Sequence, residues 1–311
     1  MLQQLEETMI DAVDKIVPSV VSVTTKGLHR ISFYRVAPLQ GQGSGVILSK
    51  EGYILTNAHV IKGAKEVNVV LSNGESYTAK VIGKSSIRDL AAIKINNGNL
   101  QPITMGNVDS IKVGQFALAV GNPLGLGITA TFGMVSAVNR TIQTRDLFLE
   151  GLIQTSAQIN SGNSGGALVN TEAELIGIPT AMVPWSQGIG FAIAVDGVQA
   201  VFDELLETGT IKTPWMGIVG LSLNSGIANH YSVPTDKGAL IVELPKGPTL
   251  TTGLEPGDVI IEINDKEISG MEELQREIMK QRVGSIMKLK VNRNNDIFDA
   301  KIELREAPET I

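Results

Sequence analysis

The sequence predicts a mainly β protein that is followed by a smaller domain mixing strands and helices. Three observations lead to this fold class. The chain has 311 residues, which is about the length of two domains. Short β-like runs alternate with turns from residue 20 onward, and the chain contains 33 glycines. After residue 214, one helical pattern lies among further β-like runs.

The first element is an amphipathic helix over residues 1–17, which ends before Pro18. Apolar residues recur on one helical face, namely Leu2, Leu5, Met9, Val13, Ile16 and Val17. A face of this kind covers the helix's own domain or, alternatively, contacts another subunit.

The next elements are strands within a domain at residues 18–209. The runs that predict them include residues 20–25, 46–48, 67–71, 77–82 and 90–95. Asn73-Gly74 is a turn signal between two of these runs. Many short strands without intervening helices favour a barrel or a sandwich, and closing a sheet also removes its exposed edges.

The remaining elements lie toward the C-terminus. Residues 196–209 have helical spacing, with Gly209 as the predicted cap, and residues 210–214 form a linker. In the domain predicted at residues 215–307, residues 254–264 have a strand-turn-strand pattern. Residues 271–281 predict an amphipathic helix and residues 287–292 a strand.

The most informative motif is Gly162-Asn163-Ser164-Gly165-Gly166, which lies between two apolar runs. Glycines permit a tight turn that presents the Ser164 hydroxyl outward and directs neighbouring N–H groups into one small space. Such a turn suits a nucleophile beside an oxyanion hole made by the N–H groups of Gly162 and Ser164, with Asn163 N–H as a helper. The alternative is an ordinary polar turn between strands.

A serine nucleophile needs a base, and the base needs an orienting group. Among the three histidines, His59 ends a β-like run, and Asp89 precedes another. The order His59, Asp89, Ser164 is that of chymotrypsin. Each residue taken alone can be explained by a structural role in a turn or at a strand end. The three together predict a catalytic triad. His29 and His230 lack such surroundings and are expected on the surface or in loops.

With the triad in place, the chain resembles the HtrA (Deg) family of serine proteases. Six segments carry the resemblance in the family's order, at residues 43–48, 56–60, 89–94, 120–125, 162–166 and 190–193. The resemblance implies a chymotrypsin-like pair of six-stranded β-barrels with the triad between them, and one C-terminal PDZ domain of α+β type. It implies an endopeptidase for unfolded or misfolded proteins in quality control.

The resemblance also implies further site residues. The segments that wall the family's specificity pocket match Ile159, Gly190, Phe191 and Ala192. Arg140 matches an arginine that relays signals from the PDZ domain to the activation loops, although a solvated turn arginine is the alternative. The loop that binds peptide C-termini matches Trp215, Met216, Gly217 and Ile218. For Trp215 and Met216 the alternative is ordinary core packing.

Three positions depart from the family pattern in the activation region. Ser156 stands where the family usually has aspartate, Ser161 where it often has proline, and Pro179 where it often has asparagine. These departures do not affect the predicted catalytic groups. They put in doubt the transfer of the family's activation details to this chain.

Composition narrows the possible functions. The chain has no cysteine, a net charge of −6 and no basic stripe, so we expect no disulfide, no cysteine nucleophile and no nucleic-acid partner. No metal-ligand spacing appears, and we expect no cofactor. No bilayer-spanning apolar run or leader pattern is present, and the family resemblance favours the cell envelope and a homotrimer or a multiple of it.

Two other functions remain open at this point. One is a chaperone or peptide-binding scaffold with secondary proteolysis, and the other is a regulatory protease of narrow specificity. A complete triad favours the enzyme, because a pure binding module has no need of all three groups.

Overall fold

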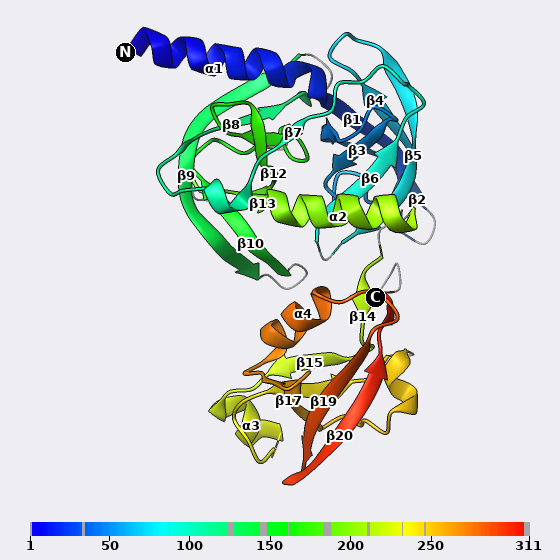
Figure 1. Cartoon of the computed structure of the whole chain (residues 1–311). Helices are drawn as coiled ribbons and strands as arrows, with labels where there is room; N and C mark the ends of the chain where they lie inside the picture. Colours follow the sequence, from blue (N-terminus) through cyan, green and yellow to red (C-terminus); the bar gives the residue numbers. More distant parts are fainter. Residues whose placement is uncertain are drawn as a thin grey trace. The chain divides into compact units, whose positions relative to one another are not determined.

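The computed structural model describes residues 2–32, 35–86, 88–123, 127–143, 148–160, 162–182, 188–209, 212–231, 233–245 and 247–307. The chain forms two compact units, residues 1–211 and residues 212–311 (Figure 1). The division falls inside the segment that we predict as a linker. None of the described helices combines the length and the apolar character needed to cross a membrane.

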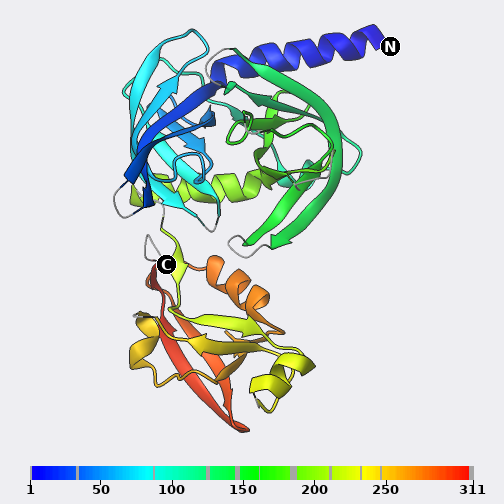
Figure 2. The ribbon, with the colours of Figure 1, turned by 180° about the vertical axis from the view of Figure 1, so that it is seen from behind.

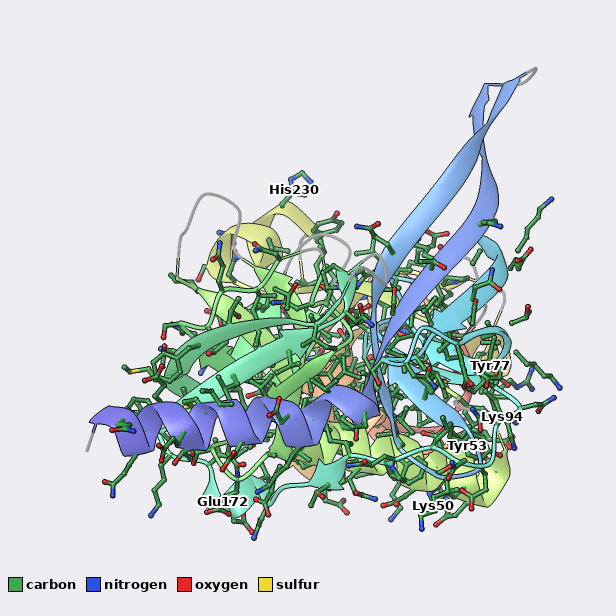
Figure 3. The ribbon with its side chains drawn as sticks, turned by 90° about the horizontal axis from the view of Figure 1, so that it is seen from above. Lys50, Tyr53, Tyr77, Lys94, Glu172 and His230 are labelled. Atoms are coloured by element: carbon green, nitrogen blue, oxygen red, sulfur yellow. The ribbon has the colours of Figure 1, made fainter. Side chains whose placement is uncertain are left out.

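The first barrel closes through six antiparallel strands in the order β1-β2-β3-β6-β5-β4. The strands are β1 (Val20–Ser32), β2 (Arg35–Ile47), β3 (Tyr53–Thr56), β4 (Ala64–Val70), β5 (Ser76–Ser85) and β6 (Leu90–Lys94). Beyond Gly27, β1 pairs with β2 alone, so this hairpin extends away from the barrel (Figure 3). On the outer face of the barrel, the Lys94 ammonium lies 4.3 Å from the ring centre of Tyr53.

The second barrel is also a closed ring of six strands. Its strands are β8 (Phe116–Gly121), β9 (Thr129–Gln143), β10 (Phe148–Thr155), β11 (Ala167–Val169), β12 (Glu174–Met182) and β13 (Gly190–Ala194). Their order is β11-β8-β9-β10-β13-β12, and pairing of β11 with β12 closes the ring. The short strand β7 (Thr104–Met105) joins β12 in parallel. The predicted pair of six-stranded barrels is therefore confirmed (Figure 2).

Two helices pack on the barrels, α1 (Leu2–Ile16) and α2 (Val195–Thr208). The 3₁₀ turn η1 (Val17–Ser19) leads from α1 into β1, and η2 (Val108–Ser110) precedes β8. One buried apolar cluster contains Leu55 of the first barrel, Leu152 of the second and Val201 of α2. Because this cluster is continuous, the barrels and α2 share one core.

The inner face of α1 covers its own domain. Ala12 and Ile16 are buried in the shared cluster, and Met9 and Val13 pack against it. Ile10 lies on the outer face and is 53% exposed. This packing matches the first of the two readings of the amphipathic pattern.

Helix α2 ends as its sequence predicts. Gly209 adopts a left-handed conformation with φ of 73°, and its N–H donates to the Leu205 carbonyl oxygen. Glycine enters that region without the steric cost that a Cβ imposes.

The second unit is a twisted sheet with two helices. Its main sheet has the order β15-β16-β17-β19-β20, with β18 paired to β17, and β14 pairs separately with β21. Its elements are β14 (Pro214–Trp215), β15 (Val219–Ser222), α3 (Ser225–Tyr231), β16 (Ala239–Glu243), η4 (Pro248–Thr251), β17 (Val259–Ile263), β18 (Lys266–Glu267), α4 (Met271–Met279), β19 (Ile286–Arg293), β20 (Asp296–Glu303) and β21 (Arg305–Glu306).

The observed strands differ from the predicted ones in a few places. Strand β2 begins at Arg35, well before residue 46, because Gly41 and Gly43 pair with β1 despite their low strand propensity. In the segment 254–264, the first half is turn, and only Val259–Ile263 forms a strand. Pro214, which we assigned to the linker, begins β14.

A buried carboxylate anchors the turn before β17. Asp258 is 1% exposed and accepts two hydrogen bonds from Arg293, at 2.6 Å from Nε and 2.8 Å from a terminal nitrogen. It also accepts the Glu255 N–H at 2.9 Å. The carboxylate hydrogen bonds raise the pKa of the Arg293 guanidinium further.

We predict that Arg293→Met destabilises the second unit, because it leaves the buried Asp258 carboxylate without its cation. The expected loss is about 2–3 kcal/mol, below the roughly 3–5 kcal/mol of a fully buried broken pair, because Arg293 is partly exposed. Hydrogen exchange of the β19 amides in the full chain measures this loss. Lys290→Met removes a more exposed pair with Glu262 and should leave exchange nearly unchanged, so equal effects of both variants would contradict the prediction.

Candidate active site

The three residues of the predicted triad come from segments that adjoin strand ends. His59 follows β3, Asp89 precedes β6, and Ser164 lies in the turn before β11. Strands β3 and β6 pair side by side, with Thr56 opposite Ala91. This pairing brings the ends that carry His59 and Asp89 together.

Asp89 is held in a left-handed conformation, with φ of 50°. Its carbonyl oxygen accepts Asn57 Nδ2 at 2.9 Å and Ala58 N–H at 3.2 Å. Its Oδ1 accepts the His59 backbone N–H at 3.0 Å. A left-handed aspartate is uncommon, and here it turns both the carbonyl and the carboxylate toward the segment that carries the histidine.

The imidazole of His59 faces this carboxylate through Nδ1, which lies 2.8 Å from Asp89 Oδ2 and 3.0 Å from Oδ1. An ionised carboxylate only accepts hydrogen bonds, so Nδ1 carries the proton and Nε2 keeps its lone pair. The side chain of Asp89 is 6% exposed, whereas that of His59 is 47% exposed. The buried acid therefore orients a ring whose remaining nitrogen is available to a reacting group.

Thr180 is a further contact of Asp89 that sequence reasoning missed. It lies on β12 and is 6% exposed, and its hydroxyl donates to Asp89 Oδ2. The carboxylate thus has partners from both barrels. A threonine inside a β-like run carries no signal of such a role, because only the fold brings it to Asp89.

The turn with Ser164 packs closely against the first barrel. Ser44 N–H donates to the Ser164 carbonyl at 2.8 Å, and Gly165 N–H donates to the Pro179 carbonyl at 2.9 Å. Gly165 has φ of 80°, and a Cβ there would overlap the Ser44 carbonyl and the Thr56 hydroxyl. Only glycine fits this position, as the motif predicts.

Ser164 is 7% exposed, and its Oγ donates to the Asn160 carbonyl at 3.4 Å. No hydrogen bond joins Ser164 Oγ to His59 among the described residues. Hydrogen bonds between catalytic groups are often long without substrate. A Cβ at Gly43 would lie 2.7 Å from a methyl of Val60 and 3.0 Å from the Ser164 carbonyl oxygen, so the serine turn lies beside the residue that follows His59.

The three predicted oxyanion-hole amides differ in their hydrogen bonding. Asn163 N–H donates to the Asn160 carbonyl at 3.1 Å, so this amide is already engaged. The Asn163 side chain closes the same turn, since its Oδ1 accepts Asn160 N–H at 2.9 Å and its Nδ2 donates to Gln158 O at 2.9 Å. Within the described part of the chain, the N–H groups of Gly162 and Ser164 have no hydrogen-bond acceptor.

Three of the predicted pocket residues, Gly190, Phe191 and Ala192, lie on β13, and Ile159 lies in the segment before the turn with Ser164. Ile159 and Ala192 belong to the core of the second barrel, whereas Phe191 belongs to the cluster shared with α2. A side chain at Gly190 would overlap Ile159. Because side chains alternate along a strand, Gly190 and Ala192 face Ile159, and the Phe191 side chain points away from it.

The regulatory positions are only partly described. Arg140 is exposed on β9 opposite Leu152 of β10, and it has no ion pair with the described residues. Ser156 Oγ accepts the Met134 N–H at 3.0 Å, which ties it to β9. Ser161 lies outside the described residues.

The other two histidines lie outside this group. His230 belongs to α3 of the second unit (Figure 3). Its ring meets that of Tyr231 edge-on, with 5.0 Å between the ring centres. His29 is on β1, and its side chain is outside the described part. No group of three or more potential metal ligands gathers among the described residues.

The predicted peptide-binding loop leads into the edge strand β15 of the second unit. Gly217 has φ of 81°, and its carbonyl accepts the Thr249 hydroxyl at 2.7 Å. Met216 is 1% exposed in the core of this unit, as in the alternative reading. Ile218 packs partly against the same core. The Trp215 ring lies close to Gly247, where a Cβ would come within 2.8 Å of it.

Comparisons with known proteins agree with this architecture. Residues 43–178 match the model of the trypsin-like peptidase domain, and residues 223–304 match that of the PDZ domain. A relative from Buchnera aphidicola, described as a probable periplasmic serine endoprotease DegP-like, is 40% identical to this chain. The matched region covers 94% of this chain and 69% of the relative. The periplasmic pH-dependent serine endoprotease DegQ of Escherichia coli is 37% identical, with the same coverage.

Solved structures extend the similarity to both units. The HtrA-type protease AlgW with decapeptide has a TM-score of 0.81 and 34% identity, covering 96% of this chain and 99% of its own. A serine endoprotease from Yersinia pestis has a TM-score of 0.74 and 32% identity, covering 96% and 98%. The chain therefore belongs to the HtrA/Deg family of serine endoproteases, with a trypsin-like peptidase domain followed by a PDZ domain.

Proposed function

We propose that this serine endoprotease cleaves unfolded or misfolded polypeptides in protein quality control, with Ser164, His59 and Asp89 as its catalytic residues. The observation that carries the proposal is the contact between His59 Nδ1 and the buried Asp89 carboxylate at 2.8 Å, beside the turn that presents Ser164. The serine endoprotease relatives support the same assignment.

In the proposed reaction, Ser164 Oγ attacks the carbonyl carbon of the scissile peptide bond, and His59 Nε2 takes its proton. His59 then gives the proton to the leaving amine nitrogen as the carbon–nitrogen bond breaks. Water, activated by His59, hydrolyses the acyl-enzyme. Asp89 stabilises the imidazolium that forms in each half, and Thr180 holds the carboxylate in place.

The negative charge of each tetrahedral intermediate requires nearby donors. We assign this role to the N–H groups of Gly162 and Ser164, which have no acceptor among the described residues. Asn163 supports the turn through its engaged N–H and its side chain. Removing one such donor typically lowers kcat about 10²–10³-fold.

The proposed specificity pocket takes a small or medium aliphatic side chain. Ile159 and Ala192 supply apolar surface, and Gly190 lies directly against Ile159. The backbone of Phe191 belongs to the wall, while its side chain packs in the shared core. A lysine or arginine side chain would enter such a pocket unpaired.

The PDZ domain is proposed to bind peptide C-termini and to raise protease activity. In the described sheet β15 is an edge strand, so its outer backbone groups are open to an added strand. Val219 and Leu221 of this strand are 40% and 37% exposed, and Met271 of α4 lies beside Gly220. The relative named as AlgW with decapeptide supports a peptide ligand.

We propose that Arg140 couples this peptide binding to the active site. Binding energy changes the rate only if the peptide favours the active arrangement of the loops over the inactive one. Assembly into trimers or multiples of trimers stays an expectation from the family resemblance.

We predict that the full chain digests unfolded casein and spares a stably folded protein, and that Ser164→Ala cleaves neither. The variant should lose about 10⁴-fold or more in kcat, because the triad acts as a unit. The release of labelled casein fragments measures the rate, and His59→Ala should be nearly as damaging.

Ser110→Ala is the matched control, because it removes a hydroxyl from an exposed 3₁₀ turn outside the site. It should retain the wild-type rate. Undiminished casein cleavage by Ser164→Ala would refute the assigned nucleophile. Cleavage of one native protein with casein left intact would favour a narrow regulatory protease, and casein kept soluble without cleavage would favour a chaperone.

We predict that cleavage follows small or medium aliphatic residues, because the proposed pocket is lined by apolar side chains. Mass spectrometry of fragments from a denatured protein gives the cleavage positions. Ile159→Ala should widen the preference toward larger apolar residues by removing side-chain volume beside Gly190. A dominant preference for lysine or arginine would show that the pocket is wrongly assigned.

We predict that peptides ending in an apolar residue bind the PDZ domain and raise the hydrolysis rate. Amidating the peptide C-terminus should weaken binding, because it removes charge-assisted hydrogen bonds. Hydrolysis rate is measured against peptide concentration for three proteins: the full chain, a chain without residues 214–311, and Arg140→Ala.

The truncated chain should keep basal cleavage and lose activation, and Arg140→Ala should bind peptide without activation. A peptide that binds the full chain tightly and leaves its rate unchanged would leave the PDZ domain as a substrate tether only.

A further inference from the structure

Ser44 lies at the meeting point of three segments that surround the proposed nucleophile. Its side chain is fully buried on β2. Its hydroxyl donates to the Gly162 carbonyl at 2.7 Å and accepts the Asn122 N–H at 2.8 Å. Its backbone N–H donates to the Ser164 carbonyl at 2.8 Å, and its carbonyl accepts the Thr56 hydroxyl at 2.7 Å. All hydrogen-bonding groups of this serine are therefore engaged.

The Ser44 hydroxyl restrains a peptide group that lies between the two proposed oxyanion donors. The peptide between Gly162 and Asn163 is held at both polar atoms, because Ser44 binds its carbonyl and Asn160 binds its N–H. Gly162 has no side chain to limit its rotation, so these hydrogen bonds supply the restraint. Loss of the Ser44 hydroxyl would release one side of this peptide.

We propose that Ser44 is a positioning residue for the oxyanion hole, which acts by holding the Gly162 carbonyl and so aligning the N–H groups of Gly162 and Ser164. The proposal rests on the roles proposed above for these two residues. Ser44 contacts neither the substrate nor the reacting atoms. Its effect should therefore appear in the stabilisation of the transition state rather than in substrate affinity.

The chain offers a matched control for this hydroxyl. Ser22 lies directly opposite Ser44 in the β1–β2 ladder and is equally buried. Its Oγ has no hydrogen-bond partner in the described structure. Ser22→Ala and Ser44→Ala thus remove the same atom from paired positions of one barrel, and only the second change breaks hydrogen bonds to the serine turn.

The experiment measures kcat and KM on a peptide substrate for the full chain, Ser44→Ala and Ser22→Ala, each below its melting temperature. Ser44→Ala should lower kcat about tenfold to a hundredfold, which at most equals the smallest effect of removing a whole oxyanion donor. KM should stay within about twofold of the wild-type value. Ser22→Ala should match the wild type.

A peptide aldehyde supplies the readout that a merely structural role would not move. Ser164 Oγ adds to the aldehyde carbon as its proton passes to His59 Nε2, and the π electrons of the carbonyl move to the former carbonyl oxygen, which occupies the oxyanion position. The inhibition constant of the aldehyde should rise by the same factor by which kcat/KM falls. The affinity of the cleaved product peptide, which forms no such oxygen, should stay unchanged.

Three results would overturn the proposal. They are an unchanged kcat in Ser44→Ala, an equal loss in Ser22→Ala, and a loss of kcat with unchanged aldehyde affinity.

If Ser44→Ala does not fold, Ser44→Cys decides by the same criteria, because a thiol is a weaker donor of similar size. Ser164→Ala is measured beside them. If it retains activity, the proposed nucleophile fails, whereas an inactive Ser164→Ala with a normal Ser44→Ala contradicts the positioning role alone.

Discussion

The close backbone contact between β2 and the serine turn is the constraint on which the site depends. The hydrogen bond from Ser44 N–H to the Ser164 carbonyl joins the two barrels where the proposed nucleophile lies. A Cβ at Gly165 would overlap the Ser44 carbonyl oxygen, and a Cβ at Gly43 would overlap Val60 and lie 3.0 Å from the Ser164 carbonyl oxygen. Glycine at these two positions therefore permits the contact between barrels.

Asp89 shows how the same fold holds the charged part of the site. Its carboxylate accepts hydrogen bonds from the His59 backbone, the His59 ring and Thr180, while its carbonyl binds Asn57 and Ala58. A buried carboxylate with several donors is fixed in place, because each hydrogen bond restrains its orientation. The buried Asp89 carboxylate therefore sets the orientation of the exposed His59 imidazole. Its Nδ1 faces the carboxylate, and its Nε2 points away from it.

Much of the architecture follows from sequence because the informative signals are local. The Gly-Asn-Ser-Gly-Gly turn and the helix cap at Gly209 can each be recognised within a few residues, and the predicted triad follows from the order of three short segments. Thr180 cannot, because its partner Asp89 is distant in sequence and only closure of the second barrel brings them together. The face of β13 on which the Phe191 side chain lies also cannot be predicted from sequence. Every residue of this strand is apolar or glycine, so no alternation of polar and apolar residues distinguishes its two faces.

The site contains rigid and adjustable parts, and this division limits how the proposed activation by peptides can work. The peptide between Gly162 and Asn163 is held at both polar atoms, and Asp89 is held by several donors. In contrast, Ser164 Oγ makes one long hydrogen bond to the Asn160 carbonyl, and the Gly162 N–H has no acceptor among the described residues. Rotation of the serine side chain is therefore the low-cost degree of freedom. A peptide that raises the rate must favour the productive rotamer by its differential affinity, and shifting a 1:99 population to 99:1 needs an affinity ratio of about 10⁴-fold.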